Sequence, residues 1–170
     1  LCWLNSDDYY FDNNVLNDVE KKIKDYDYLV GNFINIDEHD ELIKYFYAYI
    51  PFEKVKKLFF YNQIFTGALF FKKNKFKKFD TNFKFSFEYD LLFFLFKNYN
   101  GIYLDKFLAC FRILPNALSS NKKELKEEFF ELINRYNLFY SNNIFLRIFS
   151  YIRHKTLHKV IKSKIKYLLK

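Results

Sequence analysis

The stretch Trp3-Leu4-Asn5-Ser6-Asp7-Asp8-Tyr9-Tyr10 decides the fold that this sequence predicts. Residues 2–4 are apolar and are predicted to form a short buried strand that ends in a polar loop. The adjacent carboxylates of Asp7 and Asp8 would then stand at the carboxyl end of a strand, where open α/β sheets bind their ligands. A hard divalent cation with oxygen ligands would neutralise such a pair. An ordinary Asp-Asp turn that caps the next helix has the same sequence, so the pair alone leaves both interpretations open.

Outward from this stretch, segments with helical periodicity alternate with short apolar segments. Caps, apolar faces and a proline suited to a first helical turn predict helices over residues 14–24, 51–61, 87–99 and 122–140. Strands are predicted over residues 28–36, 68–71, 102–104 and 107–113, and residues 42–50 alternate weakly. This order predicts an α/β fold with a mixed sheet and flanking helices.

The composition is that of a folded chain of about one domain. Its 170 residues are 51% hydrophobic and 24% aromatic, which is enough apolar area for a core. The longest uncharged apolar stretch, residues 91–96, is too short to span a bilayer. There is no methionine and the first residue is Leu1, so we expect a trimmed start or an internal piece of a longer protein.

The positive charge is concentrated at one end of the sequence. The net charge is +8, and residues 143–170 hold eight Lys or Arg and no acid, which leaves the rest of the chain neutral. We therefore divide the chain into residues 1–120 and a helical basic extension over residues 121–170. An apolar stripe over residues 144–168 fits either a helix on the surface of an anionic membrane or a helix packed on its own domain. The neutral body argues against nucleic acid as a partner.

With the remaining motifs added, the sequence resembles the family 2 glycosyltransferases. The stretch WLNSDDYY is similar to the DxD-like metal-binding motif of that family, but Asn5 stands where many members have the first Asp, so the match rests on Asp7 and Asp8. Five further segments resemble the family's motifs in the same order: LVGN at 29–32, TGALFFKK at 66–73, FD at 79–80, FEYDL at 87–91 and LACFR at 108–112. The resemblance implies the C-terminal half of a GT-A-type domain, truncated at its N-terminus and lacking the segments that contact the nucleotide base.

The same resemblance implies a function. A metal-dependent and inverting enzyme of this kind transfers a sugar from a nucleotide-sugar donor to a saccharide or lipid-linked acceptor, and it typically builds surface polysaccharide. Asp7 and Asp8 would hold Mn²⁺ or Mg²⁺ against the donor diphosphate. Glu88 is the expected general base, where the family usually has Asp, and Asp90 is the alternative. These two residues belong to different faces of one helix, so both cannot point at one acceptor. An acid at a helix N-terminus is also favourable without any catalytic role.

Two other interpretations of the chain remain open. In the first, the chain is a catalytically inactive remnant. In the second, it is a basic amphipathic module that binds a membrane surface through residues 144–168. As a transferase, the protein is expected in the cytoplasm, at the inner face of the membrane if the basic segment binds lipid.

Overall fold

A single apolar strand, β2 (Tyr28–Ile36), organises the fold and has the bounds that the sequence predicts. It pairs in parallel with β5 (Gly101–Arg112) along its whole length. Its other edge is shared: β4 (Leu69–Phe71) pairs antiparallel with the first half and β3 (Leu42–Phe46) with the second half. All but one of the residues of β2 are buried, as is usual for a strand covered on both faces. The computed structural model describes residues 1–48, 64–114 and 122–136.

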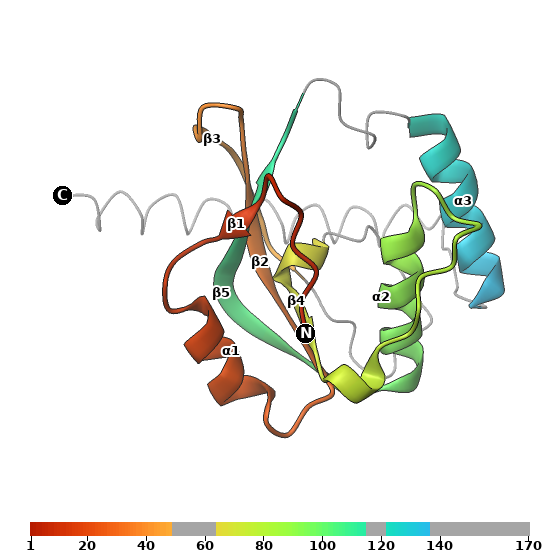
Figure 1. The fold of residues 1–170 in the computed structure, drawn as a ribbon, viewed down its shortest axis with the longest axis horizontal. Coiled ribbons are helices and arrows are strands. Elements are labelled where there is room, and N and C mark those ends of the chain that lie inside the picture. The colour runs from red at the N-terminus through yellow and green to blue at the C-terminus, as the bar shows by residue number, and fades with distance from the viewer. Residues whose placement is uncertain (49–63, 115–121, 137–170) are drawn as a thin grey trace, which may run out of the picture.

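Helices cover both faces of this sheet (Figure 1). α1 (Val15–Ile23) lies on one face, where Val15 and Val19 pack in one cluster with Leu29. α2 (Phe87–Asn98) and α3 (Lys122–Arg135) lie on the other face, in a cluster with Tyr28 and Val30. The neighbouring residues 28, 29 and 30 face alternate sides because successive side chains of a strand do so.

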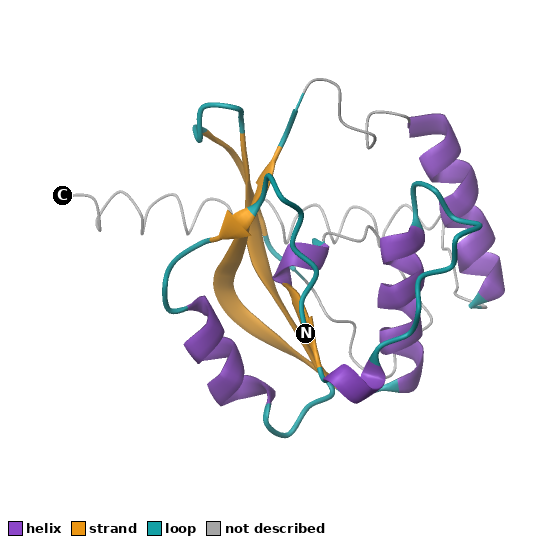
Figure 2. Cartoon of the chain, in the orientation of Figure 1, coloured by secondary structure: helices purple, strands orange, loops and turns teal. Residues whose placement is uncertain are grey.

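The described part of the chain is therefore an α/β fold with a mixed, open sheet of five strands and with three α-helices, as the sequence predicts at this level (Figure 2). The first strand of the chain is β1 (Tyr9–Tyr10), and the strand order is β1-β5-β2-β3, with β4 beside β2. Two short 3-10 helices, η2 (Thr66–Ala68) and η3 (Lys73–Lys75), flank β4.

The prediction of a strand over residues 2–4 is wrong. Cys2 forms only an isolated bridge with Phe70, and Leu1 exchanges two hydrogen bonds with Phe71. The chain then turns, with the N–H of Asp8 bonded to the carbonyl of Asn5. The strand that forms is instead β1 (Tyr9–Tyr10), which pairs antiparallel with the carboxyl-terminal part of β5. A strand exists only where a neighbour supplies hydrogen-bond partners, and the local sequence does not specify that neighbour.

The two strands predicted over residues 102–104 and 107–113 are one strand, β5. Asp105 and Lys106 interrupt the apolar pattern of this strand. They are extra residues without a partner in β2, because Gly31 pairs with Leu104 and the next residue, Asn32, pairs with Phe107. Such a bulge absorbs extra residues without ending the strand.

Three predicted features fall wholly or partly outside the described residues. These are the helix at 51–61, the end of the helix at 122–140, and the basic segment at 144–168. Within the described ranges, no helix has the length and apolar character needed to cross a membrane.

The glycine of β2 has a packing role that yields a test. A methyl group at Gly31 would overlap the side chain of Leu108 and come within 3.1 Å of the Lys106 carbonyl oxygen. Leu108 is fully buried in the core. We expect Gly31→Ala to lower the free energy of unfolding by about 1–3 kcal/mol, the usual cost of overpacking. Urea denaturation measures this change, with the exposed Asn74→Ala as the control; equal midpoints for the two variants would contradict the prediction.

Candidate active site

Asp8 is a buried carboxylate held by neutral groups. Its side chain is 7% exposed. Oδ1 accepts a hydrogen bond from the backbone N–H of Arg112 at 2.9 Å, and Oδ2 accepts one from the side-chain amide of Asn5 at 3.0 Å. Burial raises the pKa of Asp8, the two hydrogen bonds lower it, and the charge of Asp7 raises it again, so that the net shift is upward. Such a carboxylate is poorly neutralised for its depth and attracts a proton or a cation.

Arg112, the last residue of β5, does not neutralise Asp8 directly. Its guanidinium donates from Nε to the carbonyl oxygen of Asp7 at 3.1 Å and from its terminal nitrogens to the Asp37 carbonyl and the Asp40 carboxylate. Its charge has the smallest effect on the pKa of Asp8. Arg112 therefore fastens the turn after β2 to the loop that carries the two acids, and the Asp7 side chain stays exposed.

Glu88, near the middle of the sequence, is the second acid to consider beside Asp8. It lies half-buried in the first turn of α2, 80 residues after Asp8. Burial raises the pKa of Glu88, the hydroxyl of Thr66 lowers it, and the negative charge of Asp8 raises it further. The charge of Asp8 is the smallest of these effects, and it indicates that the two acids lie within electrostatic range of each other. We call Asp8 and Glu88 the acid cluster.

Thr66 completes this cluster. Its side chain is 6% exposed, and its hydroxyl oxygen is buried without a hydrogen bond of good geometry. The same hydroxyl nevertheless lies near enough to the Glu88 carboxylate to lower its pKa. The contact is thus weaker than a formed hydrogen bond, and the Thr66 hydroxyl is an unsatisfied polar group near the Glu88 carboxylate.

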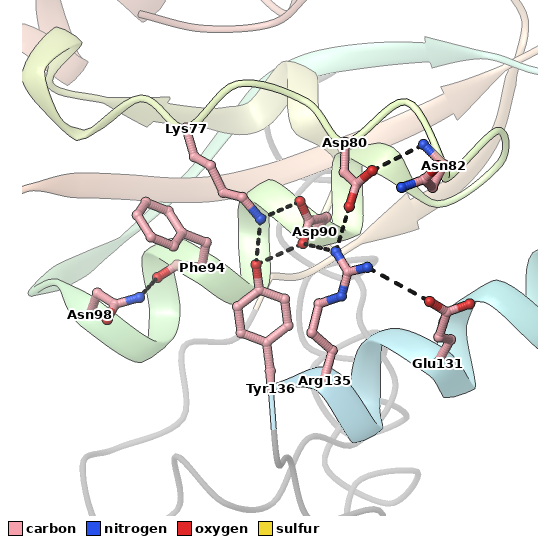
Figure 3. Close-up of polar contacts among 9 residues, drawn as sticks. All are labelled: Lys77, Asp80, Asn82, Asp90, Phe94, Asn98, Glu131, Arg135 and Tyr136. Atoms are coloured by element: carbon pink, nitrogen blue, oxygen red, sulfur yellow. Dashed lines mark hydrogen bonds and ion pairs between the residues drawn. The ribbon is translucent and has the colours of Figure 1, made fainter.

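Asp90, the alternative base, lies in a different environment (Figure 3). Only 1% of it is exposed, and its carboxylate accepts hydrogen bonds at 2.6 Å from both Lys77 Nζ and the Tyr136 hydroxyl. Burial works to lower the pKa of Lys77, but the contacts with Asp90 and Tyr136 raise it on balance. Arg135 adds a longer contact at 3.8 Å. Asp90 is therefore bound into the packing of α2 against α3, and it is Glu88 that lies beside Asp8.

An exposed tryptophan lies next to the cluster, and the sequence analysis assigned it no role there. The Trp3 ring is 41% exposed and meets the edges of Phe79 and Phe87 at centroid distances of 5.0 and 6.4 Å. Its Nε1 donates to Asn5 Oδ1 at 3.1 Å, so Asn5 links Trp3 to Asp8. The sequence does signal the turn, because Asn is common at the first position of a β-turn and the N–H of Asp8 bonds to the Asn5 carbonyl.

Asp7 and Asp8 can be compared with the ligand set that the predicted metal ion would need. In the described ranges, no three side chains of His, Cys, Asp or Glu gather as a ligand set. The oxygen donors of Asp7 and Asp8 nevertheless suit a hard divalent cation, which fills its remaining positions with water or phosphate oxygens. The elevated pKa of Asp8 is in keeping with a site that lacks positive charge. The residues present fit a partial cation site.

No protein-family model matches the sequence, and no curated protein matches it significantly.

Proposed function

We propose that this chain is part of a GT-A-type glycosyltransferase similar to family 2, which transfers a sugar from a nucleotide-sugar donor to a saccharide or lipid-linked acceptor. The observation that supports this most is that Asp8 and Glu88, from segments 80 residues apart, lie close enough for the charge of Asp8 to raise the pKa of Glu88. Both residues belong to motifs that resemble the family's. The mixed α/β sheet is compatible with a GT-A-type domain.

Glu88 is the base in this proposal. Its carboxylate takes the proton of an acceptor hydroxyl while that oxygen forms a bond to the anomeric carbon of the donor. The bond from that carbon to the diphosphate oxygen breaks, the nucleoside diphosphate leaves with the electron pair, and the configuration inverts. Burial makes Glu88 a stronger base than an exposed glutamate, since a general base works best with a pKa nearer to the operating pH.

Asp7 and Asp8 are the residues that would hold Mn²⁺ or Mg²⁺. When bound, the cation supplies positive charge that stabilises the departing diphosphate. The chain's own contribution is to place Asp8 rigidly, through the Arg112 N–H and the Asn5 amide, and to leave the neighbouring Asp7 carboxylate accessible to solvent.

A manganese titration tests this proposal on the chain itself. We expect the wild type to bind Mn²⁺, measured by electron paramagnetic resonance of the free ion, and to bind it more tightly when a nucleoside diphosphate is present. Asp8→Asn should weaken Mn²⁺ binding by about 10- to 100-fold, as losses at metal sites typically do. Asp25→Asn, which makes the same charge change at an exposed position, is the matched control and should leave binding unchanged. Equal affinities in the two variants would rule out Asp8 as a ligand.

The membrane-binding alternative depends on residues 144–168, which lie outside the described residues, so this part of the hypothesis stays a prediction. An inactive remnant predicts that the wild type binds neither Mn²⁺ nor a nucleoside diphosphate.

A further inference from the structure

The start of α2 is held by a side chain from another helix. Glu128 of α3 accepts three hydrogen bonds from consecutive backbone N–H groups, those of Lys84, Phe85 and Ser86, at 3.0, 2.9 and 2.8 Å. These groups belong to the segment that leads into α2, and Ser86 is the N-cap residue of that helix. A carboxylate suits this position because the N-terminal end of a helix carries partial positive charge.

Ser86 does not cap the helix in the usual way. A serine at this position normally accepts a hydrogen bond from an N–H of the first helical turn. Here the Ser86 hydroxyl instead donates toward the carbonyl of Leu125 in α3, at 3.4 Å, and no side-chain cap is formed. Ser86 is completely buried. The entry into α2 therefore depends on α3 for its polar contacts.

A second attachment lies within the same turn of α2. Asp90 is bound to Tyr136, and through the carboxylate also to Lys77 (Figure 3). The two attachments, of Ser86 to α3 and of Asp90 to Tyr136 just after α3, bracket Glu88. The position of the Glu88 side chain thus depends on where these contacts hold the first turn of α2.

We propose that Glu128 is a positioning residue for Glu88: by holding residues 84–86 it fixes the first turn of α2, from which the Glu88 side chain projects. Glu128 has no contact with the acid cluster and acts through the backbone of residues 84–86. The effect of Glu128 on catalysis rests on the proposed transferase function. The attachment of Glu128 to residues 84–86 does not depend on it.

Amide hydrogen exchange tests the attachment without any assay of activity. In Glu128→Ala, the amides of residues 84–86 should exchange at least about tenfold faster, because each loses its acceptor. Buried amides of β2 should keep their wild-type protection, which shows that the variant is folded. Glu127→Ala removes the neighbouring, exposed acid of the same helix and should change neither set. Wild-type amides at 84–86 that exchange as fast as in Glu128→Ala would overturn the proposal.

Kinetics test the consequence for Glu88. With a donor that the wild type turns over, Glu128→Ala should lower kcat by about 10- to 100-fold with little change in KM for the donor, since a small misplacement of a reacting group has effects of this size. Glu128→Gln keeps one acceptor oxygen and should recover part of this loss. In a Glu88→Gln background the effect of Glu128→Ala should disappear, because residues that act through one another are not additive.

The positioning role of Glu128 and the transferase function are contradicted by different outcomes. Fast exchange at residues 84–86 with an unchanged kcat would overturn the positioning role while the transferase proposal stands. A wild type that neither binds Mn²⁺ nor transfers a sugar would overturn the transferase proposal, and the positioning role with it, even if the amides are protected.

Discussion

Lys77→Ala is expected to lower the free energy of unfolding by about 3 kcal/mol, at the lower end of the range for breaking a buried ion pair. The reason is the position of Asp90, which is 1% exposed and has its charge balanced by Lys77 at 2.6 Å. Without Lys77 the carboxylate keeps the Tyr136 hydroxyl and the more distant Arg135, so part of its environment survives. Chemical denaturation at neutral pH measures the loss.

Two variants make this test specific. Lys78→Ala removes a neighbouring exposed lysine and should shift stability by less than about 0.5 kcal/mol. Lys77→Met combined with Asp90→Leu removes both charges and should recover most of the stability, because an apolar pair often replaces a buried ion pair without loss. If Lys77→Ala and Lys78→Ala unfold at the same denaturant concentration, the pair with Asp90 contributes nothing to the fold.

Glu88→Gln is expected to reduce sugar transfer by about 10²- to 10⁴-fold, the range typical for loss of a general base. Glutamine fills the same space beside Thr66 and Asp8 but cannot accept the proton of the acceptor hydroxyl. Release of nucleoside diphosphate from a panel of nucleotide sugars, in the presence of Mn²⁺ and an acceptor, measures the rate. Glu127→Gln on the surface of α3 is the matched control. Undiminished transfer by Glu88→Gln would exclude Glu88 as the base.

In Glu88→Gln at pH 7, the free energy of unfolding should rise although the rate of sugar transfer falls. Burial raises the pKa of Glu88 in the folded state, so the unfolded chain loses its proton first as the pH rises. Between the unfolded and folded pKa values the folded state binds more protons, and stability falls with pH until the folded pKa is passed. Glu88→Gln does not titrate. It should therefore be more stable than the wild type at pH 7 and gain little at about pH 4, below the ordinary pKa of glutamate. A loss of stability at pH 7 would show that the carboxylate is needed for packing.

The local sequence was sufficient to predict the bounds of an element where apolar runs, helical periodicity or breakers mark that element. Residues 28–36 form a largely apolar segment, interrupted only by Asn32 and Asn35, between polar residues, and β2 has those bounds. The helix predicted from Phe87 begins there and ends one residue earlier than expected, at Asn98, ahead of Gly101. The helix predicted up to residue 24 is α1, although Asn14 makes no side-chain cap and the Asp12 carboxylate accepts the hydrogen bond from the Asn14 N–H instead.

Pairing and side-chain neighbours were not predictable in the same way. Residues 2–4 are apolar enough for a strand, but only Cys2 meets a partner in β4. The two-residue strand β1 exists because Tyr9 lies opposite Cys110. These are contacts between residues far apart in the chain, for which a single sequence has no local signal.

By itself, the sequence determined the α/β class, the central strand and the acids to consider, since periodicity, apolar runs and breakers act over a few residues. Only the tertiary structure gave those acids different surroundings. Glu88 and Asp90 are two residues apart, yet Glu88 lies within electrostatic range of Asp8 whereas Asp90 is bound to Lys77 and Tyr136. It also brought α3, assigned from its sequence to the extension, into the core beside α2. The physical reason is that burial and charge pairing are set by neighbours in space, which a chain acquires only when it folds.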